Sequence, residues 1–146
     1  MSRIVAAVCL IVVSCLLAGC AGLAADPAED ARLWQGTWTL VSVTSNGATQ
    51  AADMQWVVDG DHYNIRLNGQ LHADPYRITL DAAHKRVDLF HHETPKGTYG
   101  GSAKGIDAIH PDSLTVCYDL TGREYPRSFD AGPGSRRAVY TFRRVR

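Results

Sequence analysis

The chain has 146 residues and no net charge, with 15 Lys and Arg against 15 Asp and Glu. This length suits one domain, and a composition that is 45% hydrophobic and 21% charged argues against a disordered chain. The neutral balance also argues against nucleic acid as a partner, because nucleic-acid-binding proteins usually carry a strong basic excess.

The first twenty residues have the pattern of an export signal. Arg3 is the only charge before Asp26, and the apolar or small run from Ile4 to Leu17 is fourteen residues long. A membrane-spanning helix needs about 20 apolar residues, so this run fits the core of a secretory signal peptide better than a stable anchor. We therefore expect residues 1–19 to be a cleaved signal peptide.

This segment ends in Leu17-Ala18-Gly19-Cys20, which resembles the lipobox of bacterial lipoproteins. The resemblance implies a lipid on Cys20 and durable attachment to a membrane, because several acyl chains hold where a single chain binds only marginally. Ala21 stands where an Asp favours inner-membrane retention in lipoproteins of diderm bacteria, so we expect the periplasmic face of the outer membrane. The alternative is an ordinary signal peptide that is cut near Ala18–Ala25.

Cleavage and lipidation would also determine how many free cysteines the mature chain has. Cys9 and Cys15 leave with the signal, and a lipidated Cys20 leaves Cys117 as the single free thiol. Neither an intramolecular disulfide nor a zinc-finger type site is then possible. Residues 20–32 are rich in Ala and predict a lipidated tether, with a short helical turn over Glu29–Trp34 ahead of the first strand.

The remaining segment, residues 33–146, shows no long helical period. It consists of short β-type runs separated by Gly, Asn, Asp and Pro, which is typical of an all-β domain. Asn68-Gly69 is the strongest hairpin signal in the chain. Short links predict an up-and-down antiparallel barrel, and eight strands are the number at which a closed barrel can just hold one small ligand. We expect the strands at Thr37–Ser45, Gln55–Val58, His62–Leu67, Tyr76–Leu80, Arg86–His91, Ser102–Ile109, Ser113–Tyr118 and Arg137–Arg144.

The two ends of this segment carry a first resemblance. Gly36-Thr37-Trp38 opens the first strand, and Arg143 and Arg144 end the last one. This arrangement resembles the lipocalins, in which a Trp on the first strand packs beneath an Arg from the final strand. The resemblance implies that Gly36, Trp38 and Arg144 close one end of the barrel, where a guanidinium over an indole gains a cation–π contact.

A more specific resemblance covers about Leu33 to Arg144. It is carried mainly by the runs Leu33–Trp38, Ile78–Asp81, Lys85–Leu89, Asp112–Tyr118 and Pro126–Phe129. On these runs the chain is similar to a family of bacterial lipocalin-like domains of unknown function, first catalogued in planctomycetes. It departs from the family pattern at Asp107 and Tyr125. The resemblance implies the barrel and supplies no activity or cofactor.

Residues suited to catalysis or metal binding are sparse. His91-His92-Glu93 is the most metal-like cluster, yet adjacent strand residues point to opposite faces and a zinc site needs three or four converging ligands. Cys117 lies within a strand between apolar neighbours, which favours a packed thiol over a nucleophile. The chain contains no nucleophile elbow, phosphate loop or dinucleotide fingerprint. We therefore expect no enzymatic activity, no metal and no cofactor.

Binding of a small, largely apolar ligand is the function that we favour. Apolar walls with a few polar groups are typical of small-molecule pockets. The hairpin at Asn68-Gly69 would pair three inward residues of one strand with Asp74, His72 and Gln70 of the next. In the opposite register Leu71 faces inward and Ile65 outward. From the first register we predict a ligand site that contains Tyr63, Ile65, Leu67 and His72.

The alternative is a barrel with a filled core that acts as a structural or protein-interaction module of the envelope. Residues 123–146 carry seven Arg against two acids, a net of +5, whereas residues 20–122 carry a net of −6. The basic segment either meets anionic headgroups or an acidic partner, or lies among acidic strands so that the charges cancel. We expect cancellation.

Overall fold

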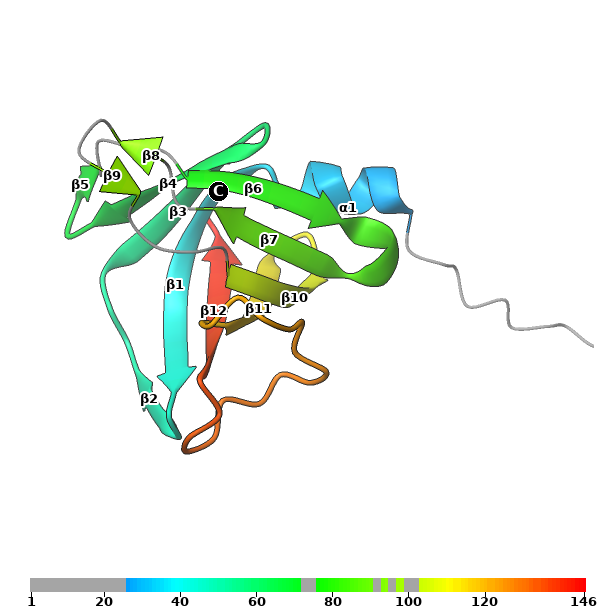
Figure 1. Ribbon diagram of the computed structural model, residues 1–146. Helices are drawn as coiled ribbons and strands as arrows, with labels where there is room; N and C mark the ends of the chain where they lie inside the picture. The colour runs from blue at the N-terminus through cyan, green and yellow to red at the C-terminus, as the bar shows by residue number, and fades with distance from the viewer. Residues whose placement is uncertain (1–25, 72–75, 91–92, 95–96, 99–102) are drawn as a thin grey trace, which may run out of the picture.

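The computed structural model of the chain describes residues 26–71, 76–90, 93–94, 97–98 and 103–146 (Figure 1). One helix, α1 (Pro27–Trp34), comes before the strands. The eight long strands are β1 (Gly36–Ser45), β3 (Met54–Asp59), β4 (His62–Leu67), β6 (Tyr76–Asp81), β7 (Arg86–Phe90), β10 (Ala103–Ile109), β11 (Ser113–Asp119) and β12 (Arg137–Arg144). The short elements are β2 (Ala48–Gln50), β5 (Gln70–Leu71), the 3₁₀ turn η1 (Ala82–His84), β8 (Glu93–Thr94) and β9 (Gly97–Thr98).

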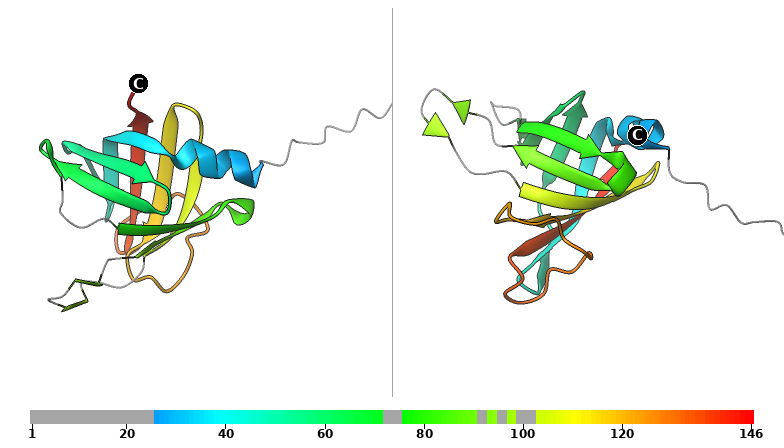
Figure 2. Two further views of the ribbon diagram at one scale, coloured as in Figure 1. Left: turned by 90° about the horizontal axis from the view of Figure 1, so that it is seen from above. Right: turned by 45° about the vertical axis from the view of Figure 1, so that its right-hand side comes forward.

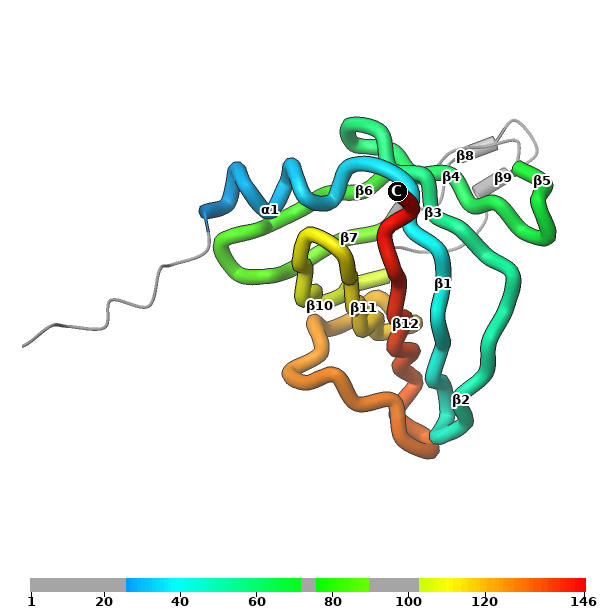
Figure 3. Tube along the Cα trace, turned by 180° about the vertical axis from the view of Figure 1, so that it is seen from behind, coloured from blue at the N-terminus to red at the C-terminus, as the bar shows by residue number. Residues whose placement is uncertain are grey.

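The long strands form a closed antiparallel barrel. Each pairs with the next long strand along the chain, and β12 returns to pair with β1. The closing ladder runs from Trp38 opposite Arg144 to Ser45 opposite Ala138, and Figure 3 shows the two strands side by side. The prediction of an eight-stranded up-and-down barrel preceded by a short helix is therefore confirmed.

The predicted strand positions agree with the structure because alternation and turn residues carry most of the local information. Asn46-Gly47 and Asn68-Gly69 both have positive φ at both residues, with values of 51° and 77° and of 49° and 78°. Two consecutive positive φ angles define the type I′ turn, whose twist matches that of paired strands. These turns join β1 to β2 and β4 to β5.

The expected register between the hairpin strands is correct only next to the turn. Leu67 lies opposite Gln70 as predicted. Further along, Tyr63 lies opposite Tyr76 and not opposite Asp74, so the register of β4 with β6 is shifted by two residues relative to its register with β5. A shift of two residues leaves each side chain on its original face, since strand side chains alternate with a period of two. Tyr63 and Ile65 therefore still face the interior.

Helix α1 is longer than the predicted turn and begins within the expected tether. The carboxylate of Asp26 caps the helix by accepting the backbone N–H of Ala28 at 3.0 Å, and Pro27 starts the first turn. Both features favour a helix start. Asp30 on this helix is buried and forms an ion pair with Lys85, which follows η1. The helix within the expected tether is thus held to the barrel through Asp30.

The two ends of the barrel differ. Figure 1 shows α1 beside one end and the short strands β5, β8 and β9 at the other, and Figure 2 gives the same arrangement from two further directions. Trp34 of the helix is 1% exposed and Trp38 of β1 is 0% exposed, so the α1 end is filled with side chains. We call this the closed end, and the opposite end of the barrel the open end.

Candidate functional site

A cavity of about 230 Å³ occupies the barrel interior toward the open end. Its aliphatic lining comes from five different strands or their ends and consists of Met54, Ile65, Leu89, Ala103 and Leu120. Its aromatic lining consists of Trp56, Tyr63, Tyr76, Tyr118 and Tyr140. Leu120 is 56% exposed and marks the rim. A concave, mostly apolar space with a few polar groups is the usual form of a small-molecule site.

Strand alternation explains which residues reach this cavity. Met54 and Trp56 of β3 are two residues apart, as are Tyr63 and Ile65 of β4 and Tyr118 and Leu120 at the end of β11. Side chains two apart on a strand share a face. The cavity is the place where these inward faces fail to fill the interior.

Trp56 stands at the centre of an aromatic cluster between the cavity and the packed core. Its ring centroid lies 4.4 Å from Phe142, 5.1 Å from Tyr63, 5.8 Å from Tyr140 and 6.1 Å from Tyr118. The rings are tilted by 37–48° relative to one another, within the range of favourable aromatic contacts. Phe142 faces the filled side, so Trp56 forms part of the inner wall of the cavity.

The predicted ligand residues have different outcomes. Tyr63 and Ile65 line the cavity. Leu67 does not: it is 37% exposed opposite Met54, two residues beyond Ile65 on the same strand. His72 lies outside the described residues. Leu71 is 54% exposed opposite Arg66, so the register that turns it inward is not the one adopted.

The aromatic lining outside β4 was missed from the sequence. Trp56 and Tyr140 belong to strands far apart in the chain, and only barrel closure brings their rings together. Alternation within each strand marks the two residues as inward-facing, but it carries no information on which inward residues meet.

Two polar groups at this cavity are buried without a partner among the described residues. They are the indole Nε1–H of Trp56 and the hydroxyl of Tyr118. Burial raises the pKa of the Tyr118 phenol well above its ordinary value, and the nearby Tyr63, Tyr140 and Asp107 raise it further. Burial likewise raises the pKa of the phenols of Tyr63 and Tyr140. These phenols therefore remain neutral, and the cavity is a medium that disfavours negative charge.

The closed end brings together the three residues predicted to close the barrel. The Arg144 guanidinium lies 4.2 Å from the centre of the Trp38 ring and donates to the backbone carbonyls of Leu33, Gln35 and Pro111. Gly36 has φ +114°, and a Cβ there would lie 3.0 Å from the Arg144 guanidinium. Glycine is needed for both the backbone conformation and the space.

A second polar group of contacts holds α1 against this end. The Trp34 indole donates to the Asp107 carboxylate at 3.1 Å, and the Trp38 indole donates to the Trp34 carbonyl at 2.9 Å. Burial raises the pKa of the Asp107 carboxyl, while the bond from Trp34 and the charge of Lys85 partly oppose the increase. Asp107 is one of the positions at which the chain departs from the family pattern.

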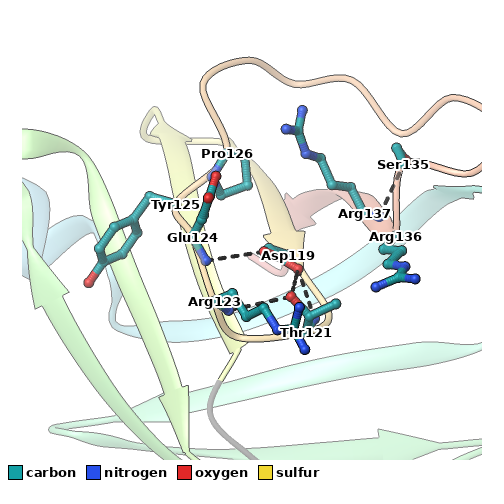
Figure 4. Close-up of a pocket in the computed structure, with 9 residues that line it drawn as sticks. All are labelled: Asp119, Thr121, Arg123, Glu124, Tyr125, Pro126, Ser135, Arg136 and Arg137. Atoms are coloured by element: carbon teal, nitrogen blue, oxygen red, sulfur yellow. Dashed lines mark hydrogen bonds between the residues drawn. The ribbon is translucent and has the colours of Figure 1, made fainter.

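A polar pocket of about 210 Å³ lies on the outside, between the ends of β11 and β12 (Figure 4). Arg123, Arg136 and Arg137 line it, but Figure 4 shows their guanidinium groups pointing in different directions. Asp119 turns its carboxylate back to Thr121 and the Glu124 N–H. Partial burial acts to raise the Asp119 pKa, but these bonds outweigh it and lower the pKa. The three guanidinium groups therefore do not point to a common position where an anion could bind.

The segment that forms this pocket is fastened to the barrel by Tyr125. Its hydroxyl donates to Asp88 at 2.9 Å, and Arg86 and Lys104 each lie 4.6 Å from the centre of its ring. Two of the seven Arg residues in the basic C-terminal segment have these further contacts: Arg144 closes the barrel and Arg146 pairs with Asp112. The expected cancellation of charge stays a prediction.

The surroundings of Cys117 do not favour a reactive thiol. Cys117 is fully buried, and burial raises the pKa of its thiol even though Arg137 acts to lower it. Among the described residues, no three His, Cys, Asp or Glu side chains are grouped as metal ligands. His91 and His92, which the sequence analysis considered and rejected as metal ligands, lie outside the described part of the chain, as does Cys20.

Comparison with known proteins adds nothing to this description. No protein-family model, no curated protein and no solved structure matches the chain. In the part of the chain that the structure describes, no helix has the length and apolar character needed to span a membrane. The resemblance to the lipocalin-like envelope family therefore stays a prediction.

Proposed function

We propose that this chain is an envelope lipoprotein, held by a lipid on Cys20 at the periplasmic face of the outer membrane, whose barrel binds a small, largely apolar ligand without chemical conversion. The observation that carries the binding role is the cavity of about 230 Å³ at the open end. Its lining is aliphatic and aromatic, and it holds no described Lys, Arg, His, Asp or Glu.

The competing role as a barrel with a filled core is less well supported. Side chains do fill the closed end, where Trp34, Trp38, Leu114 and Phe142 are each at most 1% exposed. The filling stops at Trp56, and beyond it the barrel is hollow toward the open end. A sequence selected only for a rigid scaffold has no reason to leave this space empty.

Native mass spectrometry of the protein extracted gently from its own envelope tests the binding role. We expect an extra mass that is lost on denaturation and is distinct from the acyl groups on Cys20. The variant Ala103→Phe, which places a ring in the cavity, should lose this mass. The matched variant Ala108→Phe lies on the same strand with its side chain on the opposite face and should retain it. Retention of the mass in Ala103→Phe would refute the cavity as the site.

Cell fractionation tests the anchor. The Cys20→Ser protein should move to the soluble fraction because it has no thiol to acylate. Cys117→Ser, which changes a buried thiol, should stay with the membrane. A Cys20→Ser protein that remains in the membrane fraction would contradict the lipid anchor.

A further inference from the structure

The inner wall of the cavity contains hydrogen-bond donors that the protein itself leaves unused. Trp56 is 3% exposed and Tyr118 is 2% exposed, and neither the indole N–H nor the hydroxyl has a partner among the described residues. A buried donor without a partner is costly, and most such groups in native proteins are satisfied. An acceptor that enters with a ligand would satisfy them.

The described lining of the cavity contains no positively charged side chain that could balance a negative charge. No Lys, Arg or His is found among its described lining residues. The charged group that acts on its inner wall is the Asp107 carboxylate, which adds to the effect of burial in raising the Tyr118 pKa. An anion in such an environment is destabilised by desolvation and by like charge. A carboxylate ligand is therefore disfavoured.

The volume and the lining of the cavity limit the class of ligand further. A cavity of about 150 Å³ lined by aliphatic side chains and Phe binds benzene, and this cavity of about 230 Å³ is roughly one and a half times as large. Five aromatic side chains contribute to its wall. Flat rings stack well on aromatic walls, so a planar molecule of one or two rings fits best.

We propose that the cavity takes a small, neutral, planar molecule that carries a hydrogen-bond acceptor, and that Trp56 Nε1 and the Tyr118 hydroxyl donate to that acceptor. This inference rests on the proposed function, since it names the ligand class of the same cavity. Both donor atoms are buried, and the centre of the Tyr140 ring lies 5.8 Å from that of Trp56 and 6.0 Å from that of Tyr118. Rotation of the Tyr140 side chain is the movement that we expect to uncover them.

Three probes of nearly identical shape separate these properties. They are 2-acetylnaphthalene, which is neutral and has a carbonyl acceptor, 2-isopropenylnaphthalene, which is neutral and has none, and 2-naphthoate, which is an anion. Binding is measured by titration of the Cys20→Ser protein. We expect the ketone to bind about three to ten times more tightly than the alkene, as one net hydrogen bond predicts, and at least about ten times more tightly than the carboxylate.

The indole N–H resonances of the same protein identify the donor. The Trp34 and Trp38 indoles already donate, to Asp107 and to the Trp34 carbonyl, and serve as internal references. The Trp56 resonance should move downfield with the ketone and not with the alkene. Tyr118→Phe should remove most of the advantage of the ketone and leave the affinity for the alkene unchanged. Tyr125→Phe, on the outside of the barrel, should change neither affinity.

The outcomes separate the two proposals. Equal binding of the ketone and the alkene, or preferential binding of 2-naphthoate, would overturn the ligand class and leave the binding role intact. An unchanged preference for the ketone in Tyr118→Phe, together with a stationary Trp56 resonance, would overturn the assignment of the donors. If none of the three probes binds, the planar ligand class fails, whereas the proposed function fails only if native mass spectrometry also finds no extra mass on the domain.

Discussion

At the scale of single residues, the contacts at the closed end explain why Gly36, Trp38 and Arg144 occur together in the sequence. Gly36 supplies a backbone conformation that side chains disfavour and the space that Arg144 needs. Trp38 supplies the ring surface, and the carbonyls of Leu33, Gln35 and Pro111 supply acceptors in three directions. A planar guanidinium has donors arranged as a fork, so it can bond to several carbonyls while it covers the indole.

This geometry predicts that Arg144→Lys destabilises the barrel although the charge is kept. A lysine ammonium is a compact donor that cannot cover the ring and reach three carbonyls at once. Loss of hydrogen bonds from a charged donor and of the cation–π contact should cost about 2 kcal/mol, measured by urea unfolding of the Cys20→Ser protein. Arg143→Lys, at the exposed neighbouring position, should change the stability by less than about 0.5 kcal/mol. Equal effects of the two substitutions would argue against the role of the fork.

Residue types alone did not reveal the polar contacts that fasten α1 and the outer segment. Asp107 and Tyr125 entered the sequence analysis only as departures from a family pattern. In the structure Asp107 accepts from Trp34 and Tyr125 donates to Asp88. Trp34 and Asp107 are 73 residues apart, and Tyr125 and Asp88 are 37 apart. Partners at such separations are known only once the barrel has closed.

At the scale of elements, the local sequence was sufficient to predict the positions of the long strands and insufficient to predict the short ones. Runs such as Ser113–Asp119 have enough residues to show alternation between two turn signals. β5 has two residues and β2 has three, too few for any period to be visible. The helix start at Pro27 was missed because the acidic first turn, with Glu29 and Asp30, resembles a solvated tether.

The attachment of α1 to the barrel predicts an unusual dependence of stability on pH. Burial raises the pKa of the folded Asp107 carboxyl above its ordinary value of 3.8. Between these two pKa values the folded state binds more protons than the unfolded state. The contribution of this group is therefore fully favourable below pH 3.8 and is lost as the pH rises through the folded pKa.

Asp107→Asn removes this titration and keeps an oxygen that can accept from Trp34. The variant should gain stability relative to the parent protein as the pH rises from below 3.8 to neutrality. Urea unfolding of both proteins at several pH values measures the difference and cancels the contributions of the other carboxyls. A difference that does not change with pH would mean that the carboxyl titrates alike in both states.

At the scale of the whole molecule, closure divides the barrel into a packed half and a hollow half. The β1–β12 seam is joined by seven residue pairs, and the β11–β12 seam by seven as well. Among the described residues, only two pairs join β4 to β6: His62 with Arg77 and Tyr63 with Tyr76. The Tyr63 and Tyr76 rings, which both line the cavity, stack across this seam at 5.1 Å. Among the described residues, this seam, beside the cavity, therefore has the fewest paired residues of any seam in the barrel wall.

This uneven wall predicts where the barrel opens. Local opening is easiest where few backbone hydrogen bonds must break. The amides of β4 and β6 at this seam should therefore exchange with solvent at least about ten times faster than the amides of β1 opposite β12. A tenfold difference corresponds to about 1.4 kcal/mol in the free energy of opening. Residue-resolved hydrogen exchange of the Cys20→Ser protein measures both seams. Addition of 2-acetylnaphthalene should slow exchange more at β4–β6 than at β1–β12, because a ligand against Tyr63 and Tyr76 stabilises the closed wall on that side. Equal protection of the two seams would show that the barrel opens as one unit and would contradict this prediction.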